Sequence, residues 1–103
     1  MKRKAVKPPW VLFPEVSRTS SFWYSGGGDE HNQGCLEALE RLGVRERVAY
    51  FRSHGPVPAA WADWVASVIY DDWESEPGAL VQKVERLYGL VDSLAWEAWL
   101  AAH

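Results

Sequence analysis

The sequence of 103 residues lacks a second cysteine, because Cys35 is the only one. An internal disulfide is therefore excluded, and a lone thiol is typical of a protein in a reducing compartment. The chain also lacks any apolar run near the roughly 20 residues that a membrane-spanning helix needs. Basic residues near the N-terminus are followed by Pro8 and Pro9 and not by the apolar core of a signal peptide. We therefore expect a cytoplasmic protein with no membrane partner.

Short catalytic and metal-binding motifs are missing as well. No Gly-Lys-Ser/Thr follows Gly26–Gly28, so these glycines do not form a nucleotide-binding P-loop. His31 and Cys35 lie four residues apart, but a zinc site needs three or four ligands. His54 and Asp29 are the only plausible additions, and no Cys-x-x-Cys or His-Glu-x-x-His pattern occurs. Cys35 with one of these histidines is the only candidate nucleophile pair, but a cysteine on an apolar helical face is more often core. We expect no enzyme activity, no cofactor and no metal.

Basic residues are absent from a long central stretch. Residues 1–52 hold nine Lys/Arg and six Asp/Glu, a net charge of +3, whereas residues 53–103 hold two and eight, a net charge of −6. No basic side chain lies between Arg52 and Lys83. The acidic residues of this stretch are Asp63, Asp71, Asp72, Glu74 and Glu76. A surface of one sign attracts partners of the opposite sign, although acidic residues also simply solvate exposed helix ends.

Tryptophan is unusually abundant, with seven residues in the chain. Each ring can bury up to about 250 Å², so a small helical core has limited room for all of them. We predict Trp23, Trp61 and Trp64 to be core residues. Trp73 and Trp99 lie near predicted helix ends and are predicted to be exposed, and exposed tryptophan is a common interface hot spot.

Apolar periodicity predicts a mainly α protein that forms a single domain over residues 1–103. The helical region is 30–101, a compact bundle of four helices, or five where Gly89 divides the last one and Asp92 or Ser93 caps a new segment. The predicted helices are 30–42, 44–53, 58–73 and 77–101. The predicted buried stripes include Trp61, Trp64, Val65, Val68 and Ile69 in the third helix and Leu80, Val84, Leu87, Val91, Leu94 and Ala98 in the last.

Particular residues are predicted to start and end these helices. Asp29 is suited to cap a helix that starts at Glu30, and Ser75 is suited to cap the last helix. Gly43 is typical of the residue just after a helix end. Gly34 lies inside the first helix, where glycine costs up to about 1 kcal/mol relative to alanine, so we expect a ring or backbone to pack closely there.

Two segments precede the helices. Residues 1–9 are predicted to be a flexible arm. Its basic residues are Lys2, Arg3, Lys4 and Lys7. Residues 10–29 are predicted to be extended, with 10–13 and 22–24 either paired as a short β-hairpin or lying across the helices. Gly26–Gly28 then form a tight turn, and an anion site at their N–H groups is the alternative.

The residues Pro14-Glu15, Trp23, Gly26–Gly28 and Glu30 resemble a signature of small uncharacterised proteins from phages, prophages and other mobile elements. The signature reads Pro-Glu…Trp…Gly-Gly-Gly-x-Glu, and the resemblance covers residues 14–64. It implies a genomic context rather than a mechanism, because the group has no known catalytic residues to carry over. Small phage proteins of this kind are often inhibitors of host machinery, anti-CRISPR and other counter-defence proteins among them.

Two functions follow from these patterns. The first is an interaction protein that binds and inhibits or modulates a larger host protein with a basic surface, such as a nucleic-acid-binding complex. Its candidate partner-binding residues are Asp63, Asp71, Asp72, Trp73, Glu74, Glu76 and Trp99. The alternative is a nucleic-acid-binding module. Its candidate residues are Lys2, Arg3, Lys4, Lys7 and Arg18, with Arg45 and Arg47 as additions. A homodimer through the last helix is compatible with either function.

Overall fold

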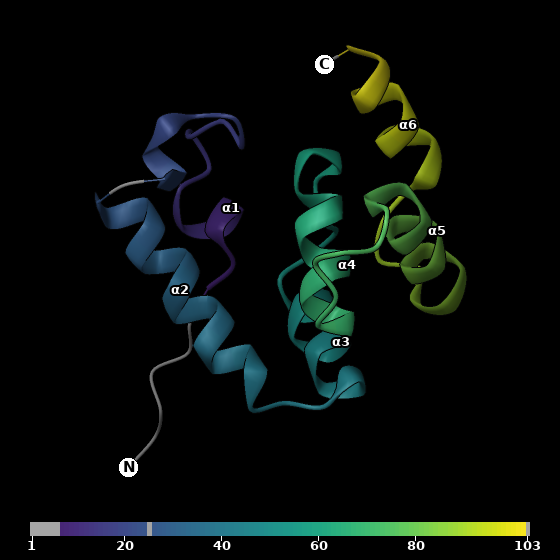
Figure 1. Ribbon diagram of the computed structural model, residues 1–103, viewed down its shortest axis with the longest axis horizontal. Coiled ribbons are helices and arrows are strands. Elements are labelled where there is room, and N and C mark those ends of the chain that lie inside the picture. The colour runs from purple at the N-terminus through teal and green to yellow at the C-terminus, as the bar shows by residue number, and fades with distance from the viewer. Residues whose placement is uncertain (1–6, 25, 103) are drawn as a thin grey trace.

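Helices make up most of the chain, as Figure 1 shows. The computed structural model describes residues 7–24 and 26–102, and within them there is no β-strand. The prediction of a mainly α protein is confirmed. The α-helices are α1 (Pro9–Leu12), α2 (Gly26–Glu40), α3 (Val44–Ser53), α4 (Ala62–Tyr70), α5 (Pro77–Tyr88) and α6 (Ser93–Ala102), and the short 3-10 turns are η1 (Ser21–Tyr24) and η2 (Ala59–Trp61). The radius of gyration of 13.3 Å is that of a compact chain.

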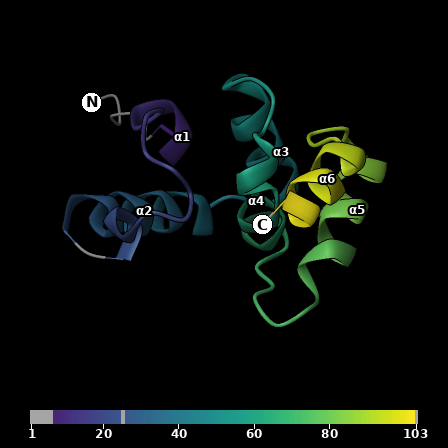
Figure 2. The same cartoon turned by 90° about the horizontal axis from the view of Figure 1, so that it is seen from above.

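Helix α4 lies at the centre, with α1 and α2 on one side and α5 and α6 on the other (Figure 1, Figure 2). Seven of its nine residues are buried, and only Asp63 and Tyr70 are half-buried. A helix that is apolar on all sides is stable only inside a protein. The predicted stripe of the third helix is confirmed, because all its members are buried: Trp61, Trp64, Val65, Val68 and Ile69.

The N-terminal segment is helical rather than extended, so the predicted strand pair is wrong. Pro9 begins the single turn of α1, where its missing N–H and fixed φ suit a helix start. Pro8 and Pro9 are buried, and Nε2 of His31 on α2 donates a 2.8 Å hydrogen bond to the carbonyl of Lys7. Residues 7–9 are therefore packed against α2 and are not part of a flexible arm. The rest of the predicted arm, residues 1–6, lies outside the described residues.

Aromatic rings join this N-terminal segment to the central helices. The Trp10 ring centroid lies 6.0 Å from that of Phe51 and 5.8 Å from that of Trp61. The Trp23 ring meets the Trp61 ring edge to face at 5.0 Å. Trp23, Trp61 and Trp64 are 4, 3 and 7 % exposed, which confirms their prediction as core residues. Such ring pairs add about 0.5–1.5 kcal/mol each beyond burial, so the cluster fixes α1 and η1 on the central helices.

Helix α2 begins at Gly26 rather than at Glu30, so the predicted glycine turn is wrong. Asp29 consequently lies in the first turn, where its charge suits the helix dipole, and it is not the N-cap. Gly28 is buried against Phe22 of η1, and a Cβ at Gly28 would lie 2.6 Å from Cδ2 of that ring. The close approach of η1 explains why glycine is required here.

The end of α2 and the start of α3 also differ from the prediction. The close contact predicted at Gly34 is wrong, because no atom lies within 4 Å of a Cβ built there. Helix α2 ends at Glu40, and Gly43 is the extended N-cap residue of α3, with φ −76° and ψ 171°, rather than a residue that ends α2. Helix α3 has the predicted bounds, 44–53.

Helix α4 is shorter than predicted, because it ends at Tyr70 rather than Trp73. Asp71 adopts the left-handed conformation, with φ 51°, and the N–H of Asp72 donates to the carbonyl of Ser67 at 3.0 Å. This pattern is a Schellman-type helix end, which glycine usually forms. The chain therefore turns away from α4 at an aspartate, and the following residues form a loop.

The last predicted helix, 77–101, is two helices in the structure. Gly89 divides them, which agrees with the alternative of five helices. Gly89 is left-handed, with φ 62°, and Oδ1 of Asp92 accepts a 2.9 Å hydrogen bond from the N–H of Leu94 at the start of α6. The predicted cap at Ser75 is wrong, because Glu76 takes the N-cap position of α5 without a side-chain hydrogen bond.

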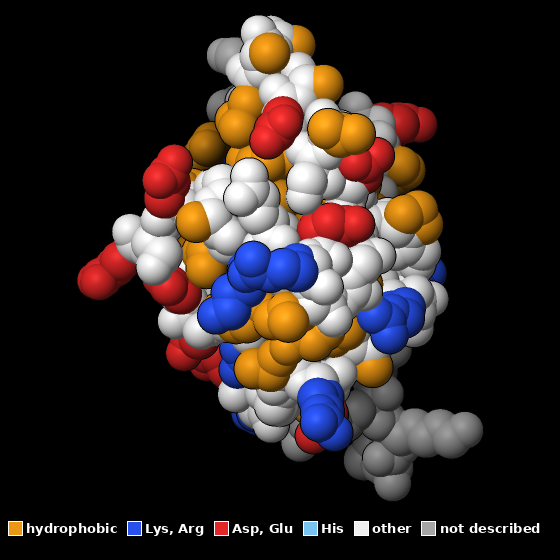
Figure 3. All heavy atoms as spheres, turned by 90° about the vertical axis from the view of Figure 1, so that its right-hand side faces the viewer, with side chains coloured by type: hydrophobic (Ala, Val, Ile, Leu, Met, Phe, Trp, Pro, Cys, Tyr) orange, Lys and Arg blue, Asp and Glu red, His pale blue; other side chains and the backbone are white. Residues whose placement is uncertain are grey.

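The break at Gly89 changes which side chains of the last two helices face the core. Leu80, Val84 and Val91 are buried as predicted. The prediction is wrong for the remaining members of that stripe, which are exposed: Leu87, Leu94 and Ala98. Figure 3 looks onto the α5–α6 side and shows hydrophobic side chains at the surface, some of them bordered by Lys and Arg.

Candidate functional site

The predicted partner-binding residues lie in three places. Most belong to residues 71–76, here called the acidic loop, which joins α4 to α5. Asp63 lies at the other end of α4. Trp99 lies on α6, where its ring stacks 5.4 Å from that of Trp96, and it is half-buried rather than exposed as predicted. The structure therefore brings Asp71, Asp72, Trp73, Glu74 and Glu76 together and leaves Asp63 and Trp99 apart.

Asp72 holds the acidic loop in shape. Its Oδ1 accepts hydrogen bonds from the N–H groups of Glu74 and Ser75 at 3.1 and 2.9 Å, and its Oδ2 accepts one from the Ser75 hydroxyl at 2.6 Å. The Ser75 hydroxyl, followed by the two N–H groups, lowers the pKa of Asp72, because each bond stabilises the charged carboxylate. The exposed acidic residues of the loop are Asp71, Glu74 and Glu76.

Trp73 stands at the edge of a groove between α2 and the acidic loop. Its side chain is 54 % exposed and lines two hollows, one of about 490 Å³ and one of about 50 Å³. Leu36 of α2 lines both hollows too, so they are neighbours, and together they are here called the α2 groove. The larger hollow is further lined by Arg18, Trp23, Tyr24, Asp29, Asn32, Gln33 and Trp64.

One wall of the α2 groove is a single face of α2. Asp29, Asn32, Leu36 and Glu40 recur three or four residues apart, which places them on one side of the helix. Sequence reasoning misses this wall, since none of its four residues is among the predicted partner-binding residues. The periodicity is readable from the sequence, but nothing in the sequence shows that the acidic loop lies opposite.

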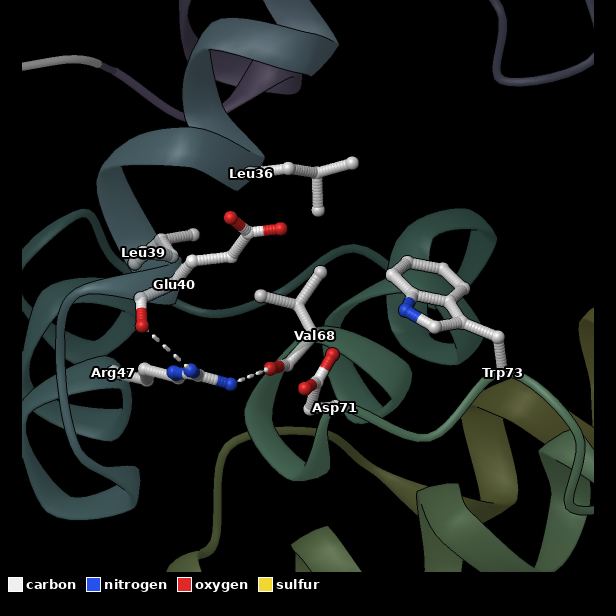
Figure 4. A pocket seen from close by; sticks show the side chains of 7 residues that line it. All are labelled: Leu36, Leu39, Glu40, Arg47, Val68, Asp71 and Trp73. Carbon is white, nitrogen blue, oxygen red and sulfur yellow. Dashed lines mark hydrogen bonds between the residues drawn. The ribbon is translucent and has the colours of Figure 1, made fainter.

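The smaller hollow combines carboxylates, an indole ring and an apolar floor, as Figure 4 shows. Glu40 reaches in from α2, Asp71 from the end of α4 and Trp73 from the acidic loop. Leu36 and Val68 line the space between them. Among the described residues, the carboxylates of Glu40 and Asp71 have no hydrogen bond or ion pair. Negative charge and an aromatic face are thus presented together to an incoming group.

Two arginines also line the groove: Arg47 is hydrogen-bonded, whereas Arg18 makes a cation–π contact and its buried Nε has no hydrogen-bond partner among the described residues. Arg47 donates to the carbonyl oxygens of Val68 at 2.7 Å and Glu40 at 3.4 Å, and its Nε donates to a third carbonyl at 3.0 Å. Arg47 thereby ties α3 to the ends of α2 and α4. The guanidinium carbon of Arg18 lies 4.8 Å from the centre of the Trp61 ring, a cation–π contact.

The residues assigned to nucleic-acid binding are only partly within the described residues. Lys2, Arg3 and Lys4 lie outside them. Lys7 and Arg45 are exposed, whereas Arg18 is half-buried over Trp61. The guanidinium group of Arg47 donates its hydrogen bonds to backbone carbonyls, so this residue does not support the nucleic-acid alternative.

Cys35 and His31 do converge, with Sγ 3.6 Å from Nε2. The thiol nevertheless donates to the carbonyl of Lys7 at 3.2 Å, the same oxygen that Nε2 of His31 bonds. Cys35 is 1 % exposed, and burial, partly offset by a hydrogen bond with Tyr50, raises its pKa to about 11. The reactive thiolate is therefore scarce at neutral pH. This cluster holds the N-terminal segment on α2, and Cys35 is a core residue.

No protein-family model, curated protein or solved structure matches the chain. Its function must therefore be argued from the geometry of its own residues. Within the described ranges, no three His, Cys, Asp or Glu side chains are grouped so that they could hold a metal ion. None of the helices in the same ranges is long and apolar enough to cross a membrane. The α2 groove combines exposed aromatic surface with unpaired charge, and we take it as the candidate functional site.

Proposed function

We propose that this chain is a small interaction protein that binds and inhibits or modulates a larger host protein through the acidic loop and Trp73. The observation that carries the proposal is the position of Trp73, an indole that is 54 % exposed at the edge of a groove. An indole left in water forgoes the stabilisation that its burial would contribute. Tryptophan is also among the residues most enriched at interface hot spots.

The charge around Trp73 favours a basic partner. Asp71, Glu74 and Glu76 are exposed in the acidic loop, and no Lys or Arg lies between Arg52 and Lys83 in the sequence. A surface of one sign accelerates encounter with the opposite sign and discourages partners of like charge. A host complex that normally holds nucleic acid presents a basic surface of this kind, and such a complex is the partner that we propose.

The resemblance over residues 14–64 supplies the context of the proposal. It favours a phage or mobile-element protein that acts in the cytoplasm as a counter-defence inhibitor, for example an anti-CRISPR protein. An inhibitor of this type works by occupying a surface and needs no catalytic group. The buried and protonated thiol of Cys35 is in keeping with that mode of action.

Affinity capture from a host lysate tests this proposal. The tagged protein is compared with a variant that carries Asp71→Lys, Glu74→Lys and Glu76→Lys, which spares Asp72 because that carboxylate holds the loop. The matched control reverses three exposed glutamates outside the groove, Glu30, Glu37 and Glu46. We expect one protein to be captured by the wild type and the control but not by the loop variant, with unchanged circular dichroism. Capture that survives reversal of the loop refutes the proposal.

The nucleic-acid alternative has a separate signature. Binding through the basic arm predicts affinity for DNA or RNA that falls steeply as salt rises, because counterions are released from the phosphates. A gel-shift titration at low salt, repeated with Lys7→Gln and Arg18→Gln, measures it. We expect no shift from the wild-type protein, and a shift that both substitutions weaken would favour the alternative.

A further inference from the structure

We infer that the α2 groove binds a positively charged segment of the partner protein, with one arginine side chain seated in the smaller hollow between Glu40, Asp71 and Trp73. This inference rests on the proposed function and names the chemistry that the partner brings to the site. Three features carry it: the unpaired carboxylates, the aromatic and apolar surfaces beside them, and the backbone conformation of Asp71.

The smaller hollow fits an arginine side chain in size and in surface. Its volume of about 50 Å³ corresponds to about four water-sized positions at about 10–15 Å³ each, and a guanidinium group has four heavy atoms. Leu36 and Val68 provide an apolar floor for the aliphatic stem (Figure 4). The face of Trp73 can stack on a planar cation, a contact that arginine makes more often than lysine.

Charge in the hollow favours a cation over an anion. Within the part of the chain that the structure describes, the carboxylates of Glu40 and Asp71 have no hydrogen-bond or ion-pair partner. Arg47, the cation that lines the same hollow, directs three nitrogens at backbone carbonyls. An incoming guanidinium would therefore meet two unpaired carboxylates, which form strong charge-assisted hydrogen bonds with it.

The backbone of Asp71 is an independent sign of function. Among the described residues it is the only one other than glycine with positive φ, at 51°. Glycine adopts this conformation at the least cost, and aspartate adopts it more readily than most other residues but still at a cost. The chain nevertheless carries an aspartate at this helix end, and its side chain lines the hollow (Figure 4). Strain of this kind is concentrated at functional sites.

The larger hollow sets the length and character of the bound segment. The face of α2 from Asp29 to Glu40 is about 16 Å long at about 1.5 Å per residue, and an extended segment of about five residues covers that length. Trp23, Tyr24 and Trp64 line this part of the groove, and Tyr24, which is 73 % exposed, offers most of the contact to apolar side chains. We therefore expect the recognised segment to combine arginine with apolar residues.

Matched peptides test the inference without the natural partner. The probe is the acetylated and amidated hexapeptide Ala-Leu-Arg-Leu-Arg-Ala, and its control carries citrulline, which keeps the shape of arginine and removes the charge. Each is titrated into nitrogen-15-labelled protein while the indole N–H signal of Trp73, assigned with Trp73→Phe, is followed. We expect the arginine peptide to move this signal and to bind about ten times more tightly than the citrulline peptide. Equal affinities, or no movement of the Trp73 signal at millimolar peptide, would overturn the inference.

Two substitutions at Asp71 separate its charge from its structural position. Asp71→Gly removes the carboxylate and relieves the strain, whereas Asp71→Asn removes the charge and keeps a residue that tolerates positive φ. We expect the glycine variant to be at least as stable as the wild type in urea, yet both variants to bind the arginine peptide about five times more weakly. Glu40→Gln should act like Asp71→Asn, and Glu46→Gln on the exposed surface of α3 is the matched control. Unchanged affinity in both Asp71 variants contradicts the inference.

Failure of this inference can be told from failure of the proposed function by the lysate capture described above. Where reversal of the acidic loop abolishes capture but Glu40→Gln and Asp71→Asn leave it intact, the protein binds its partner and the groove does not hold an arginine. Where Trp73→Ala and reversal of the loop both leave capture intact, the proposed function itself is wrong. Where all these changes weaken capture and the arginine peptide competes with the partner, both stand.

Discussion

Helices α4 and α6 are equally apolar in sequence, yet the structure covers one and leaves the other largely in water. Seven of the nine residues of α4 are buried, whereas Trp96 is the only buried residue of α6. The reason is position, because α4 lies between the other helices and α6 lies at the edge (Figure 1). The hydrophobic composition of a helix sets how much stabilisation its burial could contribute. The neighbouring helices determine how much of its apolar surface is actually buried.

Small side chains make the exposure of α6 tolerable. Four of its ten residues are alanine, which is the best helix former and exposes little apolar area. Leu94 and Leu100 are the exceptions, at 75 and 48 % exposure. The Trp96 and Trp99 rings stack on each other, with Trp96 buried and Trp99 half-buried. The outer face of α6 thus carries apolar surface that α4 does not.

The largest expected difference between the two helices comes from a matched pair of truncations. Ile69→Ala in α4 removes a side chain at 0 % exposure and should lower the free energy of unfolding by about 2–5 kcal/mol, through lost burial and a cavity. Leu94→Ala in α6, at 75 % exposure, should change it by less than about 0.5 kcal/mol. Urea unfolding followed by circular dichroism measures both. Losses of similar size would break the comparison, because they would mean that α6 is covered in solution.

Two glycines of α2 allow the same comparison between a packed and an unpacked position within one residue type. Gly28→Ala forces a Cβ against Phe22 and should destabilise the fold by about 1–3 kcal/mol. Gly34→Ala meets no atom within 4 Å, so it should stabilise the fold by up to about 1 kcal/mol, the helix propensity of alanine over glycine. Thermal unfolding of the two variants gives the signs. A destabilised Gly34→Ala variant would show a contact at this position that the structure does not contain.

Burial also predicts a dependence of stability on pH. Burial raises the pKa of Cys35 from 9.0 to about 11, so between these values the unfolded chain loses its thiol proton before the folded chain does. The contribution to stability is complete below pH 9 and falls as the pH rises toward 11, by at most about 1.4 kcal/mol per pH unit. Urea midpoints at pH 8 to 11 should fall less steeply in Cys35→Ala. Equal slopes would mean that this thiol does not carry the effect.

The smallest change in the stability of the monomer is expected from Leu94→Glu, within about 0.5 kcal/mol, because the side chain is 75 % exposed. The same substitution tests the predicted homodimer through the last helix. If two copies cover the outer faces of α6, sedimentation equilibrium should show self-association of the wild type that Leu94→Glu weakens. A wild type that stays monomeric at every concentration would mean that the outer face of α6 is exposed to solvent, whereas α4 is buried.

The predictions that succeeded depend on short spacings. The bounds of α3 follow from its apolar periodicity and the Gly-Pro stop behind it, and Gly89 divides the last two helices because glycine adopts positive φ at little cost. The predicted start of α2 was wrong because three consecutive glycines are typical of a turn. Only the packing of Phe22 on Gly28 shows that Gly26–Gly28 begin the helix. The α2 groove was not predicted, because the sequence identified the acidic residues on one side of it but not the wall of α2 that lies opposite.

By itself, the sequence determined the helical class, the buried stripe of α4 and the separation of charge along the chain. Each of these depends on residues that are a few positions apart, and the properties of such neighbours can be predicted from the sequence without a structure. Only the tertiary structure decided that one face of α2 lies opposite Trp73 and that α6 remains uncovered. These features depend on how segments far apart in the sequence pack together, and hydrophobic attraction, which has no direction, does not specify that in advance.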